Sequence, residues 1–328
     1  MHDSISIIIP TLNEEKFIAS CLDSVLKQTY PSENMDIMVI DGGSTDKTQE
    51  IVEAYHTLYD NIRLIHNPGK IQSIAFNLGV KQSTAPYIIR LDAHVTYDMN
   101  YIANCINGLK HNEKIGNIGG VCKIQPVNAS LWAVTNAILN QSKFGIGGAT
   151  FRIGGEAGEV DTVPFGCFPR KVIETVGGMR EDLARGEDNE YNSRIKKAGY
   201  IIYFDPAIVS IYYSRPTLRT SCKQMFANGE SIGNLLYIDK SAIGIRHFIP
   251  LLFVLYIILI GALSMASKYI LCLYLCGIGL YFVCDILASF YASFKYGIKY
   301  FIPLFLMFFC VHISYGLGTI KGIITHTK

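Results

Sequence analysis

The chain has 328 residues and a formal net charge of +2, from 29 basic and 27 acidic residues. A charge this close to balance does not suggest a nucleic-acid-binding protein, which would usually be strongly basic, so no nucleic-acid partner is expected. Charged residues occur throughout residues 1–240 and almost disappear after Arg246. The nine cysteines are scattered and form no CxxC pair, which favours a reducing compartment over a disulfide framework.

Short buried strands alternate with helices in the first part of the chain. The apolar run Ser6–Pro10 predicts a strand, and a helical pattern follows it, with Asn13 as a candidate cap. Residues 35–40, 62–65 and 87–91 predict three more strands, with helical patterns between them. This alternation predicts the α/β class, with a mostly parallel, Rossmann-like sheet covered on both faces.

Polar clusters follow three of these strands, at Thr11–Glu15, Asp41–Asp46 and Asp92–His94. Ligands of such sheets bind beyond the carboxyl ends of the strands. We therefore expect the three clusters to meet at one edge of the sheet. The chain has neither GxGxxG nor GxxxxGK[ST], which weighs against a dinucleotide-binding or P-loop protein.

Three apolar runs close the sequence, at 248–266, 270–293 and 300–320. Each is long enough to cross the hydrocarbon core of a membrane, which is about 30 Å thick. The second run carries Asp285 and the third carries His312, and we expect both to face a bundle interior or a polar lumen. There they serve either a lipid-linked substrate or an interhelical hydrogen bond.

The orientation in the membrane follows from the lysines and from the N-terminus. The apolar run near the N-terminus, within residues 1–10, is too short for a signal peptide, so the N-terminal part of the chain is expected in the cytoplasm. Lys295 and Lys299 then lie on the cytoplasmic side, as the positive-inside tendency predicts, whereas Lys268, Lys321 and Lys328 fit this arrangement less well. One of the three runs could therefore be interfacial rather than spanning.

Four motifs, taken in order, resemble those of the family 2 glycosyltransferases, which have the GT-A fold. They are IIIPTLNEE at 7–15, DGGSTD at 41–46, LDAH at 91–94 and GED at 186–188. Gly42 stands where the family pattern D-D-G-S-x-D has its second acid, and His94 stands at the metal-ligand position of its D-x-D. The three apolar runs, RLDAH at 90–94 and HISYGLG at 312–318 further resemble the ExoA-like branch, associated with bacterial exopolysaccharide and capsule synthesis.

This resemblance implies a GT-A domain over residues 1–240 and a transmembrane domain over 245–328, in a multi-pass plasma-membrane protein whose catalytic domain is cytoplasmic. It implies an inverting transferase that moves a hexose from a UDP-sugar to a lipid-linked oligosaccharide, with other polysaccharide-assembly enzymes as further partners. Processive synthases of the superfamily carry Q-x-x-R-W, and this chain has QMFANG at 224–229, which counts against processive synthesis.

Asp188 is the candidate base, because the acceptor hydroxyl must lose a proton as it attacks the anomeric carbon. The alternative is that Asp188 and Glu187 only favour the start of a helix. Asp92 and His94 would hold a divalent cation, Mn²⁺ or Mg²⁺, against the donor diphosphate. The alternative for His94 is that it lies at the surface or only supports a residue that contacts the cation. Asp41 would accept a hydrogen bond from the uracil imide, with a turn or cap role as its alternative.

The other substrate contacts that the resemblance implies come from the same loops and from the segment before the first apolar run. They are Pro10, Thr11, Asn13, Glu14, Gly43, Lys70, Glu187, Arg215, Arg219 and Gln224. Within an expected basic helix at 215–235, Arg215, Arg219 and Lys223 recur every fourth residue and would bind either a diphosphate or anionic headgroups. The Gly-rich segment 147–168, with Arg152 and Asp161, is expected to be a mobile acceptor loop, or else a plain linker.

Two other functions stay open from the sequence. One is sugar transfer onto polyprenyl phosphate itself, which equally requires membrane helices. The other is a non-catalytic membrane protein with a degenerate nucleotide-sugar-binding domain, for which Gly42 and His94 are the only support.

Overall fold

The computed structural model describes residues 2–214 and 217–326, and the chain divides into two compact units. The sheet unit comprises residues 1–123 and 154–212, and the helical unit comprises 124–153 and 213–328. This division differs from the boundary expected near residue 240, because two segments before it belong to the helical unit.

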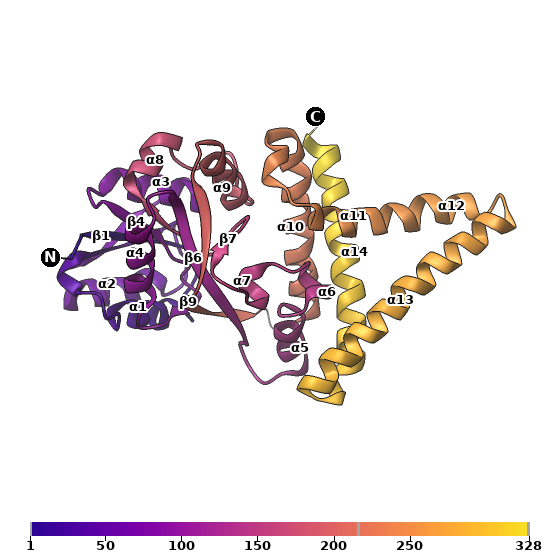
Figure 1. Ribbon diagram of the computed structural model, residues 1–328. Helices are drawn as coiled ribbons and strands as arrows, with labels where there is room; N and C mark the ends of the chain where they lie inside the picture. Colours follow the sequence, from indigo (N-terminus) through magenta and orange to yellow (C-terminus); the bar gives the residue numbers. More distant parts are fainter. Residues whose placement is uncertain (1, 215–216, 327–328) are drawn as a thin grey trace. The chain divides into compact units, whose positions relative to one another are not determined.

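The sheet unit is built on a mixed, mostly parallel sheet with the strand order β3-β2-β1-β4-β8-β6-β9-β5 (Figure 1). Strands β1 to β4 are parallel to one another, and β8 runs antiparallel to its neighbours β4 and β6. The strand bounds are β1 Ile5–Thr11, β2 Met35–Asp41, β3 Ile62–His66, β4 Tyr87–Arg90, β5 Val95–Tyr97, β6 Ile115–Pro126, β7 Gly158–Glu159, β8 Cys167–Pro169 and β9 Ile201–Ser214.

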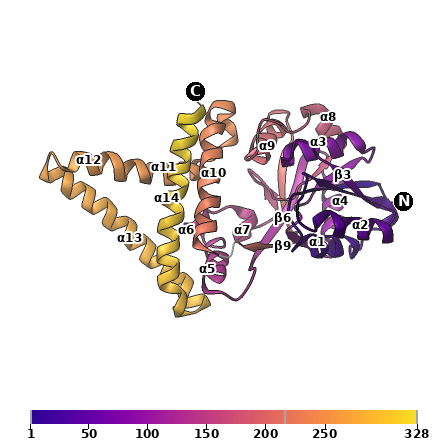
Figure 2. The same cartoon turned by 180° about the vertical axis from the view of Figure 1, so that it is seen from behind.

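Helices pack on this sheet and supply the parallel connections, as both views show (Figures 1 and 2). All seven residues of β1 are buried, as expected for an Ile-rich central strand. Gly79 of α3 lets that helix approach the sheet, because a Cβ there would lie 2.6 Å from Ile8. The helices are α1 Ile18–Leu26, α2 Thr48–Leu58, α3 Gln72–Gln82, α4 Tyr101–His111, α8 Arg170–Val176 and α9 Glu187–Lys197.

The first helix departs from the sequence expectation. Helix α1 begins at Ile18 with Phe17 as its N-cap, so Asn13 does not cap it. Asn13 instead has φ of 55° and belongs to the loop that follows β1. Asparagine tolerates this left-handed conformation better than most residues.

Within its described residues, the helical unit contains three helices that are long and apolar enough to cross a membrane: Ile245–Ser264, Lys268–Tyr296 and Ile298–Thr325. The first is α11 Phe248–Leu255, a π-helical turn at Tyr256–Ile260 and α12 Gly261–Ser264; the others are mainly α13 Lys268–Tyr296 and α14 Phe301–His326. The unit also holds α5 Leu131–Leu139, α6 Lys143–Ile146, α7 Thr150–Ile153 and α10 Leu218–Ile238.

Of the Asp and His side chains in the apolar runs, Asp285 is buried within this unit and His312 is half-buried in it. His312 of α14 contacts the Tyr281 hydroxyl of α13 at 2.9 Å and the Phe144 carbonyl at 2.9 Å. Asp285 of α13 is fully buried and accepts a hydrogen bond from Ser289 of the same helix. The interhelical hydrogen bond expected as one alternative is therefore present for His312.

Candidate active site

The loops after β1 and β2 are joined by hydrogen bonds at the carboxyl edge of the sheet. The Asn13 N–H donates to Ser44 Oγ at 2.8 Å, and the Thr45 N–H donates to Asn13 Oδ1 at 2.8 Å. The Glu14 N–H donates to Thr48 Oγ1 at 2.8 Å. These bonds satisfy backbone donors in both loops and fix the two polar clusters against each other.

Asp41 serves the turn in which it lies. Its carboxylate is buried and accepts hydrogen bonds from the Gly43 N–H at 2.8 Å, the Ser44 N–H at 2.9 Å and Gln49 Nε2 at 2.7 Å. The Ser44 hydroxyl donates to its other oxygen. A carboxylate has about four acceptor positions, so a base N–H would compete with this turn for Asp41.

The local backbone geometry favours glycine at both residue 42 and residue 43. A Cβ on Gly42 would lie 3.2 Å from Lys70 Cα, tighter than ordinary contact, and Gly43 has φ of 84°. Lys70 itself has φ of 62° in the loop after β3. Thr11 is buried and its carbonyl accepts from the Gly42 N–H at 2.8 Å. The loops after β1, β2 and β3 therefore meet at this edge, next to Pro10.

The loop after β4 joins the same edge through His94. His94 Nδ1 lies 2.9 Å from Glu14 Oε1, and both side chains are 21% exposed. The imidazole also meets the Tyr212 ring edge-on, at 5.3 Å between centroids. All three polar clusters predicted from the sequence therefore come together.

Arg90 joins the loop after β4 to the start of α9. Its side chain is 6% exposed, and Nη2 donates to Asp92 Oδ1 at 2.8 Å while Nη1 donates to Asp188. Glu187 Oε1 lies 3.8 Å from the same Nη1. Burial lowers the pKa of Arg90, but the surrounding carboxylates outweigh it and raise that pKa well above its ordinary value.

The two acids of the GED motif have different environments. Glu187 is buried, and burial, then the charge of Asp188, raises its pKa to about 7 against the opposing effect of Arg90. The Asp188 side chain is 40% exposed. The N-cap of α9 is Gly186, with φ of 85° and no side chain, so neither acid is the capping residue. Of the two, only Asp188 is open to an incoming hydroxyl.

Arg90 and Tyr97 are site residues that the motif analysis missed. The Tyr97 hydroxyl accepts from the Asp92 N–H at 2.8 Å and contacts the Asp92 carbonyl at 3.2 Å, so it fixes the backbone of the D-x-D position. A sequence signal for Arg90 existed, because an arginine at the end of an apolar strand is a buried charge that needs acidic partners.

The described residues contain no group of three or more His, Cys, Asp or Glu side chains that could hold a metal ion. Asp92 and His94 fit a cation that takes its remaining ligands from a substrate, as Mg²⁺ commonly does from phosphates. The Glu14–His94 pair matches an arrangement frequent at metal sites, in which a carboxylate orients the ligating imidazole.

Some of the predicted residues do not belong to the sheet unit. Arg152, Arg219 and Gln224 belong to the helical unit, and Arg215 lies outside the described residues. Asp161 lies in the sheet unit and forms an ion pair with Lys196 at 3.5 Å. The proposed acceptor loop 147–168 thus begins in one unit and ends in the other.

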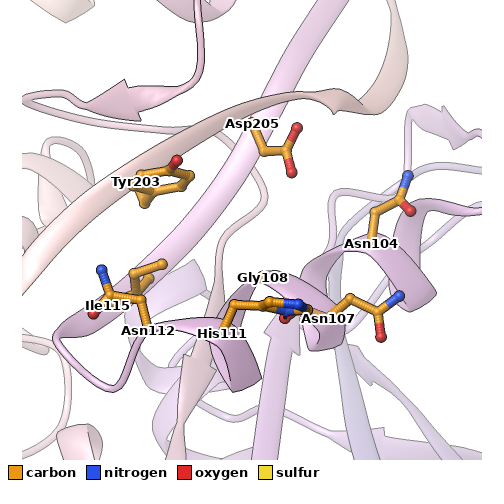
Figure 3. Close-up of a pocket in the computed structure, with 8 residues that line it drawn as sticks. All are labelled: Asn104, Asn107, Gly108, His111, Asn112, Ile115, Tyr203 and Asp205. Atoms are coloured by element: carbon orange, nitrogen blue, oxygen red, sulfur yellow. Dashed lines mark hydrogen bonds between the residues drawn. The ribbon is translucent and has the colours of Figure 1, made fainter.

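A separate shallow cavity of about 320 Å³ lies between α4 and β9 (Figure 3). Tyr203 and Asp205 of β9 face residues of α4 across it. None of the predicted site residues lines it. Its lining is Asn104, Asn107, Gly108, His111, Asn112, Ile115, Tyr203 and Asp205.

Several known proteins resemble this chain over most of its length. The family model described as glycosyl transferase family 2 matches residues 6–176, just over half of the chain. A dolichyl N-acetyl-α-D-glucosaminyl phosphate 3-β-D-2,3-diacetamido-2,3-dideoxy-β-D-glucuronosyltransferase of Methanococcus voltae is 32% identical over 79% of this chain and 82% of its own. Succinoglycan biosynthesis protein ExoA of Rhizobium meliloti is 30% identical over 75% of this chain and 74% of its own.

Solved structures show the same fold. The mannosyltransferase PcManGT of Pyrobaculum calidifontis, in complex with GDP-Man and Mn²⁺, aligns with a TM-score of 0.63 at 18% identity, over 94% of this chain and 88% of its own. S. aureus TarS 1-349 with UDP-GlcNAc aligns with a TM-score of 0.53 at 19% identity, over 75% of this chain and 72% of its own. The sheet unit accordingly has the GT-A fold, and the chain is a glycosyltransferase that belongs to glycosyl transferase family 2.

Proposed function

We propose that this glycosyltransferase transfers a hexose from a UDP-sugar to a lipid-linked oligosaccharide, with inversion at the anomeric carbon. The acceptor class is supported by the Methanococcus relative, whose name describes transfer to a dolichyl-linked sugar phosphate, and by ExoA, a succinoglycan biosynthesis protein. The donor class is supported by TarS, which was solved with UDP-GlcNAc, although PcManGT was solved with GDP-Man.

The observation that carries the proposal is the Arg90 bridge. One guanidinium contacts Asp92, at the donor side of the edge, and Asp188, at the start of α9. It therefore brings the acid proposed to face the diphosphate close to the acid proposed to face the acceptor. Holding the reacting groups in register is a large part of what an enzyme contributes to transfer.

Asp188 acts as the base in this proposal. The acceptor oxygen attacks the anomeric carbon, its proton passes to the Asp188 carboxylate, and the bond to the donor diphosphate breaks on the opposite face. A single displacement of this kind inverts the anomeric centre. Arg90 holds the Asp188 carboxylate at the start of α9 through a direct hydrogen bond.

Asp92 and His94 would hold the divalent cation. When bound, the cation neutralises the diphosphate and so stabilises the leaving group. An imidazole ligand suits Mn²⁺ better than Mg²⁺, which prefers oxygen. Glu14 keeps the His94 ring oriented through Nδ1.

A donor screen on purified membranes that contain the protein tests the proposal. UDP- and GDP-sugars are supplied with or without Mn²⁺, and the acceptor is either polyprenyl phosphate or a polyprenyl-diphosphate sugar. The lipid products of each reaction are then extracted and identified. Transfer to the polyprenyl-diphosphate sugar from a UDP-hexose is expected. A product formed only on polyprenyl phosphate would replace the proposed acceptor. Absence of donor turnover under all these conditions would refute the proposed donor class.

A further inference from the structure

The three long apolar helices differ in how much protein covers them. We compare the most apolar 18-residue stretch of each helix. The buried share of its residues is 11% in Ile245–Ser264 and 6% in Lys268–Tyr296, but 39% in Ile298–Thr325. A helix that faces lipid leaves its apolar side chains uncovered. The first two helices meet this condition and the third departs from it.

Helix α14 is covered because α10 runs along it, in parallel and in backbone contact. A Cβ on Gly229 of α10 would lie 2.0 Å from the Tyr315 carbonyl oxygen, and one on Gly233 would lie 2.4 Å from that of Thr319. Conversely, a Cβ on Gly318 of α14 would lie 2.0 Å from the Phe226 carbonyl oxygen. Both views show α10 and α14 side by side (Figures 1 and 2).

Helix α10 is too polar to accompany α14 through hydrocarbon. Its residues Leu218 and Met225 pack against the cluster that contains Leu304 and Phe308, so the exposed Arg219 and Lys223 lie level with the first half of α14. Charged groups in a bilayer core are strongly disfavoured. If α14 crossed the membrane, these charges would cross with it.

The other two helices form an antiparallel hairpin with contacts of its own. The Tyr256 hydroxyl donates to the Leu273 carbonyl at 2.6 Å, and the Phe253 and Tyr281 rings stack with centroids 4.0 Å apart. A Cβ on Gly277 would lie 2.2 Å from the Tyr256 hydroxyl. At about 1.5 Å per residue, each arm is long enough to cross a bilayer.

We propose that this hairpin, residues 248–296, crosses the membrane twice, and that α14 lies with α10 at the membrane surface on the side where the hairpin begins. Lys295, Lys299 and Lys321 are then on one side, and Lys268 is the basic residue at the tip of the hairpin. This arrangement reduces the mismatch with the positive-inside tendency that three spans produce, because Lys321 moves to the side of Lys295 and Lys299 and only Lys268 stays opposite. Lys321 also reaches Glu230 of α10, with 2.7 Å between Nζ and Oε1.

Protease protection in sealed vesicles of both orientations tests the topology of the full chain. Epitope tags are placed at the N-terminus, in the exposed turn at Met265, and after Lys328. The N- and C-terminal tags are expected to be cleaved in one vesicle orientation and the turn tag in the other. A C-terminal tag cleaved together with the turn tag means three spans. A turn tag cleaved together with the N-terminal tag, or in neither orientation, means that the hairpin does not cross. Either result overturns the proposal.

A second measurement tests the pairing of α10 with α14. Gly318→Leu should lower the thermal midpoint of the detergent-solubilised protein, because its side chain has no space against α10. Gly279→Leu on α13 is the matched control, since a Cβ there meets nothing within 4 Å. Equal midpoints for the two variants would show that α14 does not lie against α10 and would overturn the proposal.

Discussion

Replacing Glu187 by glutamine should change how the stability of the protein depends on pH. Burial first, and then the charge of Asp188, raises the pKa of Glu187 from 4.5 to about 7. In the unfolded chain both influences disappear. Between these two pH values the folded protein keeps a proton that the unfolded chain has lost.

The sign and the size of the effect follow from this difference. Because the folded-state pKa is raised, the contribution of Glu187 to stability is fully present below about pH 4.5 and is lost as the pH rises through about 7. One pKa unit corresponds to about 1.4 kcal/mol, so the loss amounts to about 3 kcal/mol. The Glu187 side chain is only 8% exposed, so solvent screens little of this amount. A neutral glutamine of similar shape removes the dependence.

The assay compares thermal midpoints of the wild-type protein and Glu187→Gln in detergent, at pH 5 and pH 8 and at one scan rate. The midpoint of the variant relative to the wild type should be higher at pH 8 than at pH 5. Glu156→Gln, at an exposed position of the same unit, is the control and should show no such change. The same difference at both pH values for Glu187→Gln would refute the reasoning that Glu187 is buried and protonated near neutral pH.

Three other substitutions test the proposed roles. Asp188→Asn should lower kcat by about 10²- to 10⁴-fold and leave donor affinity unchanged, because it removes a general base. Calorimetry measures donor binding and a radiolabelled assay measures transfer. Wild-type turnover in this variant would contradict the assignment. Arg90→Lys should lower kcat/KM by about tenfold or more, because an ammonium group cannot reproduce the planar fork that contacts Asp92 and Asp188. Steady-state kinetics measures kcat/KM, and an unchanged value would mean that the bridge has no catalytic consequence. His94→Asp should raise activity in Mg²⁺ relative to Mn²⁺, because oxygen replaces nitrogen; an unchanged activity ratio would contradict His94 as a ligand.

The first half of the sheet could be predicted because each strand is an uninterrupted apolar run between helices. The predicted strand at 35–40 became β2, Met35–Asp41, and the one at 62–65 became β3, Ile62–His66. The later strands were not predicted. Strand β6, Ile115–Pro126, contains a glycine pair and polar residues, and β8 is three residues long, so neither carries a clear periodic signal.

The candidate site could be predicted at the level of loops but not of contacts. Polar residues at the ends of parallel strands were expected to meet, and the Glu14–His94 contact shows that two of these loops do. The Arg90–Asp188 bond joins residues 98 positions apart, and no spacing rule indicates such a pairing. The position of α10 was missed for a related reason, since the glycines that admit it to α14 have meaning only when the partner helix is known.

The two departures from the family pattern, Gly42 and His94, each have a structural reason within this chain. A Cβ added at residue 42 would lie 3.2 Å from the Lys70 Cα, which is tighter than an ordinary contact. The glycine therefore fits the close approach of the loop after β3. His94 is held by Glu14 and packed on Tyr212. A buried arginine between three acids is costly unless its geometry is maintained, and this geometry is intact in the loop that carries His94. Gly42 and His94 therefore fit a reorganised donor site, whose cation preference the His94→Asp variant measures directly.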